Sequence, residues 1–497
     1  MNAMAPIEEC LDMIIVGAGI SGIGMAVHMA RDCPGKSIVI LDRRDSVGGT
    51  WDLFRYPGIR SDSDMHTLGF SFAPWKHEKS IADGPAILEY LDAITGEYNL
   101  RDKMRLGQKV ISADWDSKTA RWTVVSEQAD GTHQRLQARF LFLGSGYYDY
   151  DEPYDAEFKG RSKFKGQIVH PQFWPQDLDY RGKNVVVIGS GATAVTIVPA
   201  MANSGAGHVT QLQRTPTYMV SRPARDAIAN NLRKVLPEKL AYAITRFKNI
   251  TLQDWMFKRV RKNPEKARDF LLGETAKNLG AHYNETDFMP PYNPWEQRLC
   301  LVPDADFFEA IKSGKAEVVT DHIDSFDATG IKLKSGKHLD ADVIVTATGL
   351  KLAVAGKIAI SVDGEAVDFS KRFYYRNCMF SNVPNLAGVF GYINASWTLR
   401  VDIIGEYLTR LIKQMDAYGA VAATPAMAAD AVPEHEDIFA DFSSGYLARG
   451  KDMMPRNAPA LPWRLNQDYR KDRVDMRQSP IDDGVMQFTR AKELVEG

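Results

Sequence analysis

The sequence predicts an α/β fold with two dinucleotide-binding domains of the Rossmann type and a helical insertion in the second domain. Two glycine-rich fingerprints support this, each lying between an apolar run suited to a buried parallel strand and a helical stretch. A chain of 497 residues is also too long for one compact core. The insertion, residues 226 to 280, is indicated by apolar residues at helical spacings: Leu232, Val235, Leu240, Ile244 and Phe247.

The first fingerprint follows the apolar run Met13–Val16. In such a unit the first glycine permits a tight turn, the second lets backbone amides approach a pyrophosphate, and the third lets helix and strand pack closely. An acidic residue at the end of the second strand accepts hydrogen bonds from an adenosine ribose. The residues in these positions are Gly17, Gly19, Gly22 and Asp42. They predict an ADP-binding site for a redox cofactor.

The second fingerprint follows Asn184–Ile188 and predicts a second nucleotide site. Its positions are occupied by Gly189, Gly191, Thr193 and Ala194, and the fingerprint allows alanine as its third small residue. The next strand ends in Arg214 and Thr215 instead of an acid. A carboxylate would repel a 2′-phosphate, whereas the planar arginine fork matches it. We therefore expect NADPH in preference to NADH, the alternative being that Arg214 is a solvated loop arginine.

Two longer motifs make a family resemblance visible. The stretch between the fingerprints has the form F-x-G-x-x-x-H-x-x-x-W-P, with fixed positions at Phe164, Gly166, His170, Trp174 and Pro175. A second stretch matches G-G-x-W-x-x-x-x-[FY]-P-G-x-x-x-D, which here starts with Gly48, Gly49 and Trp51 and ends at Asp62. In form and position both resemble signatures of type I Baeyer–Villiger monooxygenases. Residues 50–65, 81–84, 292–303, 394–399 and 462–467 further resemble the ethionamide monooxygenase subgroup.

The resemblance implies an enzyme that binds FAD and NADPH. Such an enzyme inserts one oxygen atom of O2 next to a ketone carbonyl to give an ester, through a flavin C4a-peroxide, with sulfide oxidation as a second activity. Arg298 would be the fixed cation beside the peroxide, and Asp62 would tune its placement. His170 would couple the domains, with Phe173 and Trp174 anchoring the linker. Gln297 departs from the cyclohexanone-type enzymes, whose lysine at this position helps to hold the 2′-phosphate.

Two alternatives from related classes are less favoured. A flavin monooxygenase of the N- or S-oxygenating type characteristically lacks the W-P ending that Trp174 and Pro175 provide. A disulfide reductase also has two nucleotide units but requires a cysteine pair. The four cysteines are scattered without a C-x-x-C pair, which also argues against a zinc site. No metal is expected.

The composition limits the partners. Lys and Arg number 61 against 63 for Asp and Glu, a net charge of −2, so a nucleic-acid partner is not expected. The start of the chain lacks a signal-peptide pattern and no apolar run reaches about 18 residues, so we expect a cytoplasmic enzyme without a transmembrane segment. A basic stretch between residues 246 and 268 could contact an anionic membrane surface, but a solvated helix face is favoured.

The family resemblance implies that the substrates are ketones and organosulfur compounds.

The expected domain order places the first part of the FAD domain at residues 1–148. A linker with the long fingerprint follows at 149–180, and the NADPH domain with its insertion at 181–342. The apolar run from Val343, which ends in A-T-G, resembles the strand on which such chains return to the FAD domain, so residues 343–497 are assigned to that domain and a C-terminal segment. Trp397 could line a pocket or fill core.

Overall fold

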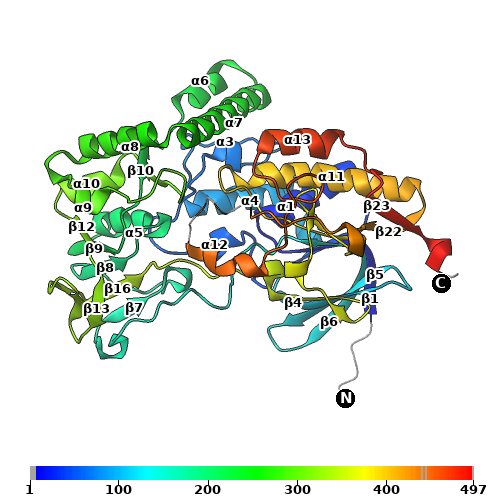
Figure 1. Cartoon of the computed structure of the whole chain (residues 1–497), viewed down its shortest axis with the longest axis horizontal. Coiled ribbons are helices and arrows are strands. Elements are labelled where there is room, and N and C mark those ends of the chain that lie inside the picture. The colour runs from blue at the N-terminus through cyan, green and yellow to red at the C-terminus, as the bar shows by residue number, and fades with distance from the viewer. Residues whose placement is uncertain (1–6, 438–439, 441, 443–444, 495–497) are drawn as a thin grey trace.

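A computed structural model describes residues 7–437, 440, 442 and 445–494 of the chain. Two α/β domains lie side by side, and the helices of the insertion project above them (Figure 1). The first domain combines segments from both ends of the chain, and the second is formed by the middle of the chain.

The sheet of the first domain has a parallel centre, in which β3, β2, β1 and β6 are neighbours and β21 pairs with β6. An antiparallel extension follows through β5 and β4, and β17 and β18 complete that edge. The strands are β1 (Ile7–Val16), β2 (Ile38–Leu41), β3 (Met104–Arg105), β4 (Gln108–Asp116), β5 (Arg121–Gln128), β6 (His133–Leu143), β17 (Ala359–Val362), β18 (Glu365–Ala366), β19 (Tyr374–Tyr375), β20 (Met379–Phe380) and β21 (Leu386–Gly388).

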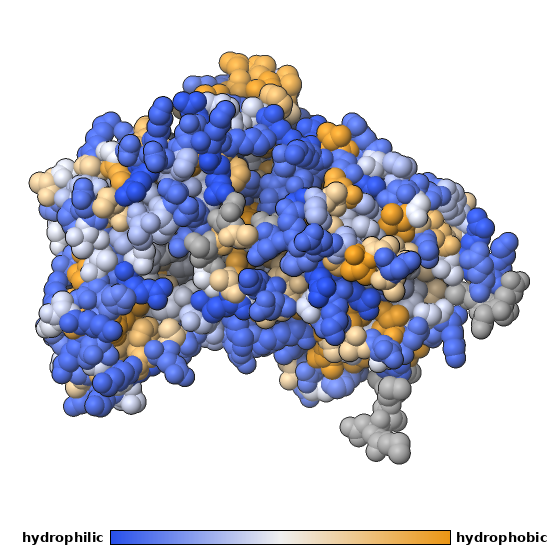
Figure 2. Space-filling view, in the orientation of Figure 1, coloured by the Kyte–Doolittle hydropathy of each residue, from blue (hydrophilic) through white to orange (hydrophobic). Residues whose placement is uncertain are grey.

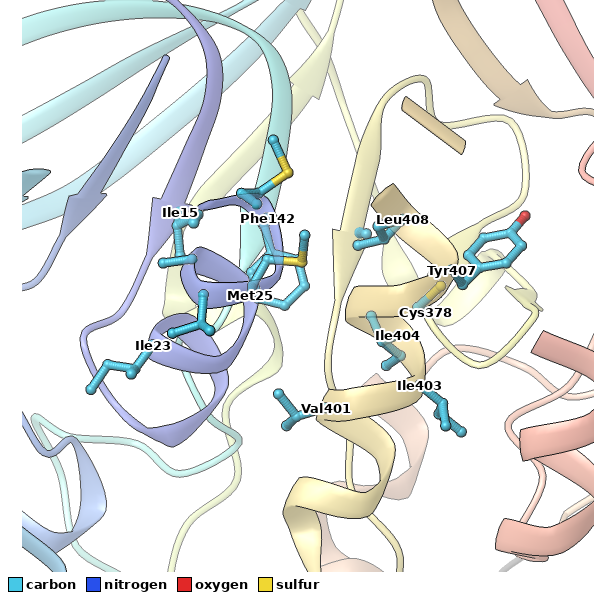
Figure 3. Packing of buried hydrophobic residues seen from close by; sticks show 14 of the residues in the cluster. Ile15, Ile23, Met25, Phe142, Cys378, Val401, Ile403, Ile404, Tyr407 and Leu408 are labelled. Carbon is cyan, nitrogen blue, oxygen red and sulfur yellow. The ribbon is translucent and has the colours of Figure 1, made fainter. Parts of the chain in front are cut away.

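Two helices from opposite ends of the sequence pack together on this sheet. They are α1 (Ile20–Asp32) and α11 (Trp397–Ala417). Figure 3 shows Ile23 and Met25 of α1 on one side and Val401 and Ile404 of α11 on the other, all buried in one core cluster. The smaller helices of this domain are α2 (Thr50–Leu53), α3 (Met65–Leu68) and α4 (Gly84–Glu97).

The second domain has a parallel five-stranded sheet in the order β12-β9-β8-β16-β7. Its strands are β7 (Gln167–Val169), β8 (Asn184–Ile188), β9 (His208–Gln213), β12 (Ala316–Thr320) and β16 (Val343–Thr346), and its helices are α5 (Ala192–Asn203), α9 (Glu285–Phe288) and α10 (Asp306–Lys312). A small antiparallel sheet lies beside it, formed by β13 (Ile323–Phe326), β14 (Gly330–Leu333) and β15 (His338–Asp340).

The pairing of β16 shows that the domain boundary expected between residues 342 and 343 was wrong. This strand pairs with β8 on one side and β7 on the other, so it belongs to the second domain and does not join the first sheet. Its apolar run correctly indicated a strand buried on both faces, but such a run cannot show which sheet takes it. The chain re-enters the first sheet at β17. The linker fingerprint likewise contains β7, the edge strand of the second domain.

The predicted helical insertion is confirmed. It consists of α6 (Ala227–Val235), α7 (Glu238–Lys262) and α8 (Pro264–Leu279). The strands that flank it, β10 (Met219–Arg222) and β11 (Cys300–Pro303), pair in parallel at its base. The C-terminal part adds α12 (Gly445–Gly450), α13 (Tyr469–Gln478) and the pair β22 (Ala420–Pro425) and β23 (Met486–Arg490). Within the described residues, no helix combines the length and apolar character needed to cross a bilayer.

Candidate active site

A cavity of about 500 Å³ lies where the two domains meet. Both fingerprint loops contribute to its wall, and so do the G-G-x-W motif, Asp62, Gln297 and Arg298. The cavity therefore brings together residues that the sequence places in three separate motifs.

The first fingerprint forms the predicted strand–turn–helix unit. Gly17 has φ +103°, and a Cβ on Gly22 would lie 1.8 Å from the Gly17 carbonyl oxygen, so both positions exclude larger residues. Helix α1 begins after Gly19 without a capping side chain. Since the first amides of a helix have no intrahelical partner, this end presents free N–H donors to an anion.

Asp42 stands at the end of β2, in the wall of the cavity. One carboxylate oxygen accepts the Ala18 N–H at 2.6 Å and the other accepts the Arg44 N–H at 2.8 Å. Burial raises the pKa of Asp42, while these two N–H donors oppose the rise. Each oxygen keeps a further lone pair, so the position suits a ribose hydroxyl.

The G-G-x-W motif closes the first phosphate loop from the other side. Gly48 donates its N–H to the Ala18 carbonyl at 3.0 Å. A Cβ on Gly49 would lie 2.9 Å from the Gly19 Cα, so the two loops touch through their backbones. Trp51 is half-buried in the cavity wall.

The second fingerprint repeats this arrangement at α5. Its helix begins after Gly191 without a side-chain cap, and a Cβ on Gly191 would meet no atom within 4 Å. Open space and free amides together fit a phosphate group. Thr193 lines the cavity, whereas Ala194 is fully buried and Gly189 lies against Ala347.

The end of β9 carries no acid. Gln213 is buried, and its side-chain amide donates to the Asp287 carbonyl at 2.8 Å and to the Thr320 hydroxyl at 2.9 Å. Arg214 is exposed, and within the described part of the chain its side chain has no ion pair or hydrogen bond. Arg214 and Thr215 lie outside the wall of the cavity. The arginine is thus available to a group bound at the end of this strand.

Asp62 and Arg298 reach the cavity from different domains. The Asp62 side chain is exposed, yet the surface it exposes lines the cavity, and protein surrounds its remaining sides. This surrounding protein raises the pKa of Asp62, and the positive charges of Arg298 and Arg60 partly oppose the rise. Arg60 forms an ion pair with Asp306 of α10, which ties the Asp62 loop to the second domain.

The loop that carries Gln297 and Arg298 is held in an unusual conformation. Trp295 has φ +70°, which is rare for a bulky residue and is retained where surrounding contacts determine it. Its ring packs edge-on against Phe257 of α7, with centroids 5.2 Å apart. The Asn293 side-chain amide donates to Glu296 at 2.9 Å. Contacts with the insertion therefore help to set the path of the arginine loop.

The cavity wall also contains residues to which the sequence assigned no definite role. Tyr56 lines the cavity together with Thr193 of the second fingerprint. Its fixed place in the G-G-x-W motif was an available signal. Trp397 lines the cavity, donates to the Ser21 hydroxyl at 2.8 Å and stacks on Tyr147 at 5.0 Å. It also packs against the core cluster of the first domain, so it does both of the things that the sequence left open. Cys300 is a buried thiol of the cavity wall. It lies in the segment 292–303 that carries the family resemblance, but no motif assigns it a role.

His170 lies outside the cavity wall. Its Nδ1 accepts the Gln172 N–H at 3.1 Å, and burial lowers the pKa of the imidazole. Trp174 packs against the core of the second domain, but Phe173 is 48% exposed, so the expectation that Phe173 anchors the linker was wrong. Phe164 packs in the core and Gly166 packs closely against the Asp342 carbonyl, while Pro175 lies in the following turn.

Two helix starts that follow glycine-rich fingerprints and lack capping side chains line one cavity, an arrangement typical of oxidoreductases that bring two dinucleotides together. The model of the pyridine nucleotide-disulphide oxidoreductase family matches residues 14–266. All four cysteines are free thiols, so the described chain has no disulfide of the kind that family name mentions. Within the described residues, no group of three or more His, Cys, Asp or Glu could hold a metal ion.

Comparison with known proteins identifies the family more narrowly. The chain is 50% identical to the FAD-containing monooxygenase EthA of Mycobacterium tuberculosis over 483 residues, 97% of this chain and 98% of that protein. It is 46% identical to the probable FAD-binding monooxygenase AlmA of Acinetobacter baylyi over 490 residues, 98% of each. The chain belongs to this family of FAD-containing monooxygenases. It is thus a flavoprotein oxidoreductase with FAD and a pyridine nucleotide as cofactors.

Solved structures show the same fold. A cyclohexanone monooxygenase with bound ε-caprolactone has a TM-score of 0.75 and 20% identity, and the match covers 97% of this chain and 100% of that one. An oxidized steroid monooxygenase bound to NADP has a TM-score of 0.75 and 22% identity, with the same coverage. At these identities the likeness shows the two-domain fold alone.

Proposed function

We propose that the protein is a Baeyer–Villiger monooxygenase. A ketone, O2, NADPH and a proton would yield an ester, NADP⁺ and water. Sulfides would be a second class of substrate, since a thioether sulfur can also accept one oxygen atom. The observation that best supports this proposal is that Asp62 and Arg298 enter one cavity from different domains, beside the helix starts of both fingerprints.

The residues present fit both cofactors. The uncapped start of α1 and the acid at the end of β2 suit FAD, which would be held by Gly17, Gly19, Gly22, Asp42, Gly48, Gly49 and Trp51. The open space at Gly191 suits NADPH, and so does Arg214, whose side chain has no partner among the described residues. NADPH would be held by Gly189, Gly191, Thr193, Ala194, Arg214, Thr215 and Gln297. When bound, FAD would supply the two-electron chemistry that connects NADPH with O2.

Arg298 would stabilise negative charge that develops on oxygen during the reaction. A fixed cation in a partly enclosed site needs no reorganisation, which is why such charges favour an anionic transition state. Asp62 would position Arg298 by ion pairing and is therefore a positioning residue. The aromatic wall of Tyr147 and Trp397 would restrict water at the cavity. Such a wall suits apolar ketones.

Product analysis with isotope labelling tests the proposal. The FAD-loaded enzyme would be supplied with NADPH, ¹⁸O2 and 2-decanone, and in parallel with methyl phenyl sulfide. We expect an ester that contains one ¹⁸O atom, and a labelled sulfoxide from the second reaction. Sulfoxide without any ester from a series of linear, cyclic and aryl ketones would instead indicate an N- or S-oxygenating flavin monooxygenase.

A further inference from the structure

The long insertion helix α7 packs against the first domain through its polar face. The side chains that it buries include Tyr242, Thr245, Arg246 and Asn249. An amphipathic helix of a globular protein ordinarily does the reverse and turns its apolar stripe toward the core.

Specific hydrogen bonds hold this inverted orientation. The buried Arg246 guanidinium donates to three carbonyls of the first domain, at His66, Thr67 and Gly69, and pairs with Asp402 at 2.9 Å. Asn249 donates to Asp64 at 2.9 Å and the Tyr242 hydroxyl donates to the Phe70 carbonyl at 2.9 Å. These contacts satisfy the buried polar groups, so the orientation of α7 is well determined.

The opposite face of α7 exposes an apolar stripe. Leu240, Ile244 and Phe247 lie at spacings of four and three residues on one side of the helix, and Phe247 is 68% exposed. Helix α6 extends the surface through Ile228 and Val235, the latter 76% exposed. Figure 2 shows this apolar cluster at the tip of the molecule, over the junction of α6 and α7. We call these five residues the apolar tip.

Positive charge accompanies the apolar tip. Residues 227–262, which span α6 and α7, contain nine Lys and Arg but two Asp and Glu, a formal charge of +7 in a chain whose net charge is −2. Lys234, Lys239 and Lys262 are exposed and form no ion pair within the described part of the chain. Trp255 and Arg259, farther along α7, form a cation–π pair at 5.4 Å on its exposed side.

We propose that the apolar tip and its basic flanks dock the enzyme on an anionic lipid surface. Exposed apolar side chains among lysines and arginines are the pattern of helices that lie in a membrane interface. Charge favours lipid over a second copy of the chain, since a twofold contact would bring two sites of charge +7 together. The sequence pattern alone favoured a solvated helix face, but it did not reveal that the apolar stripe faces outward.

Vesicle sedimentation with the full-length, FAD-loaded enzyme tests the proposal. We expect binding to vesicles of equal parts phosphatidylcholine and phosphatidylglycerol, at least tenfold weaker binding to phosphatidylcholine alone, and weakening at high salt. The double variant Val235→Gln/Phe247→Gln should bind at least tenfold less. The charge variant Lys239→Glu/Lys262→Glu should lose the preference for anionic lipid.

Ile7→Gln is the matched apolar control, because Ile7 is also exposed but lies near the N-terminus at the opposite end of the molecule (Figure 1). It should bind vesicles like the unchanged enzyme, and all variants should retain FAD and the unfolding temperature. Equal binding to both vesicle types, or none to either, would overturn the proposal. So would a dimer in analytical ultracentrifugation that the tip substitutions dissociate, since a second copy would then cover the surface.

Discussion

At the scale of single residues, the choice of nicotinamide cofactor depends on Arg214. Its guanidinium is exposed, has no partner in the part of the chain that the structure describes, and stands where an acid would select NADH. Arg214→Ala should weaken NADPH about 10- to 100-fold, because a charge-assisted phosphate contact contributes about 1.5–3 kcal/mol. NADH should be almost unaffected, and steady-state kinetics with both donors measures the difference.

Two further variants sharpen this test. Arg181→Ala removes an exposed arginine just before β8, at the other end of the parallel sheet, and should change neither donor. Gln297→Lys restores a cation at the cavity and should tighten NADPH selectively. Equal losses for NADPH and NADH in Arg214→Ala would refute the phosphate role.

Asp62 and Arg298 predict a particular dependence on pH. Because the surrounding protein raises the pKa of Asp62, the attraction between its carboxylate and Arg298 should be lost at a less acidic pH than for an ordinary aspartate. Ester formation should therefore fall on the acid side of its pH profile as Asp62 is protonated. In the isosteric Asp62→Asn variant that acid limb should disappear and the maximal rate should be lower.

Arg298→Ala should have the larger effect, with about 10²–10³ less ester formation, since it removes the charge itself. Both variants should still bind FAD. An Asp62→Asn enzyme with an unchanged acid limb would show that another group titrates. Normal ester formation in Arg298→Ala would make the arginine a structural residue.

The site residues differ in how well the sequence could indicate them. Gly17, Asp62 and Arg298 stand in dense motifs that drew attention to them, and all three line one cavity. Tyr147 and Cys300 reach the same wall only through the packing of the two domains, and neither has a spacing that indicates it. Sequence patterns report local geometry, whereas a wall between domains depends on contacts that are distant in the chain.

At the scale of elements, the contact between α1 and α11 contains a buried charge cluster. His28 of α1 is 2% exposed and lies 3.5 Å from Asp32 and 3.8 Å from Asp402 of α11. Desolvation alone would lower the pKa of His28, but the two carboxylates outweigh it and raise the pKa to about 9. The charged imidazole therefore stabilises the folded state.

This cluster predicts how stability changes with pH. In the folded protein the pKa of His28 lies above its unfolded value of about 6.5. The stabilisation by the charged imidazole is therefore fully present below about pH 6.5 and is lost as the pH rises through about 9. The shift corresponds to roughly 3 kcal/mol. His28→Gln should lower the unfolding temperature at pH 6 and flatten its decline between pH 6.5 and 9. His282→Gln, at an exposed histidine, is the control, and an unchanged pH dependence in His28→Gln would contradict the assignment.

The presence of helix α7 was easier to predict than which of its faces is buried. The spacing of Leu240, Ile244 and Phe247 correctly indicated a helix. The same spacing would ordinarily mark the buried face, yet that face is exposed because Arg246 and Asn249 find carbonyl and carboxylate partners on the first domain. Those partners lie more than a hundred residues away in sequence, beyond the reach of any local pattern.

At the scale of the whole molecule, the linker fingerprint crosses from one domain to the other. His170 follows β7, and the buried Gln172 beside it donates to the Asp149 carbonyl at 2.7 Å. If this segment couples domain positions, His170→Ala should retain FAD but yield much less ester per NADPH, with H2O2 released instead. Product and NADPH would be counted in the same reaction. Full ester yield in the variant would reject the coupling role.

The fingerprints correctly predicted two domains, but they did not predict which strands belong to which of the two sheets. β16 resembled a return to the first domain and instead completes the second sheet. The first sheet consequently takes up the chain again at β17, and its strand β21 pairs beside β6, with Leu386 opposite Leu141.

That interrupted sheet has a consequence for synthesis on the ribosome. The second domain, from β7 to β16, emerges as one continuous unit, whereas the first cannot close its core until α11 has left the exit tunnel. Contacts so distant in sequence form late, because a long loop must be closed first. In nascent chains arrested at a length where β16 has left the tunnel but α11 has not, the second domain should therefore resist protease while the first is still cleaved. Equal protection of both domains at that length would show that the first sheet can assemble without its C-terminal strands.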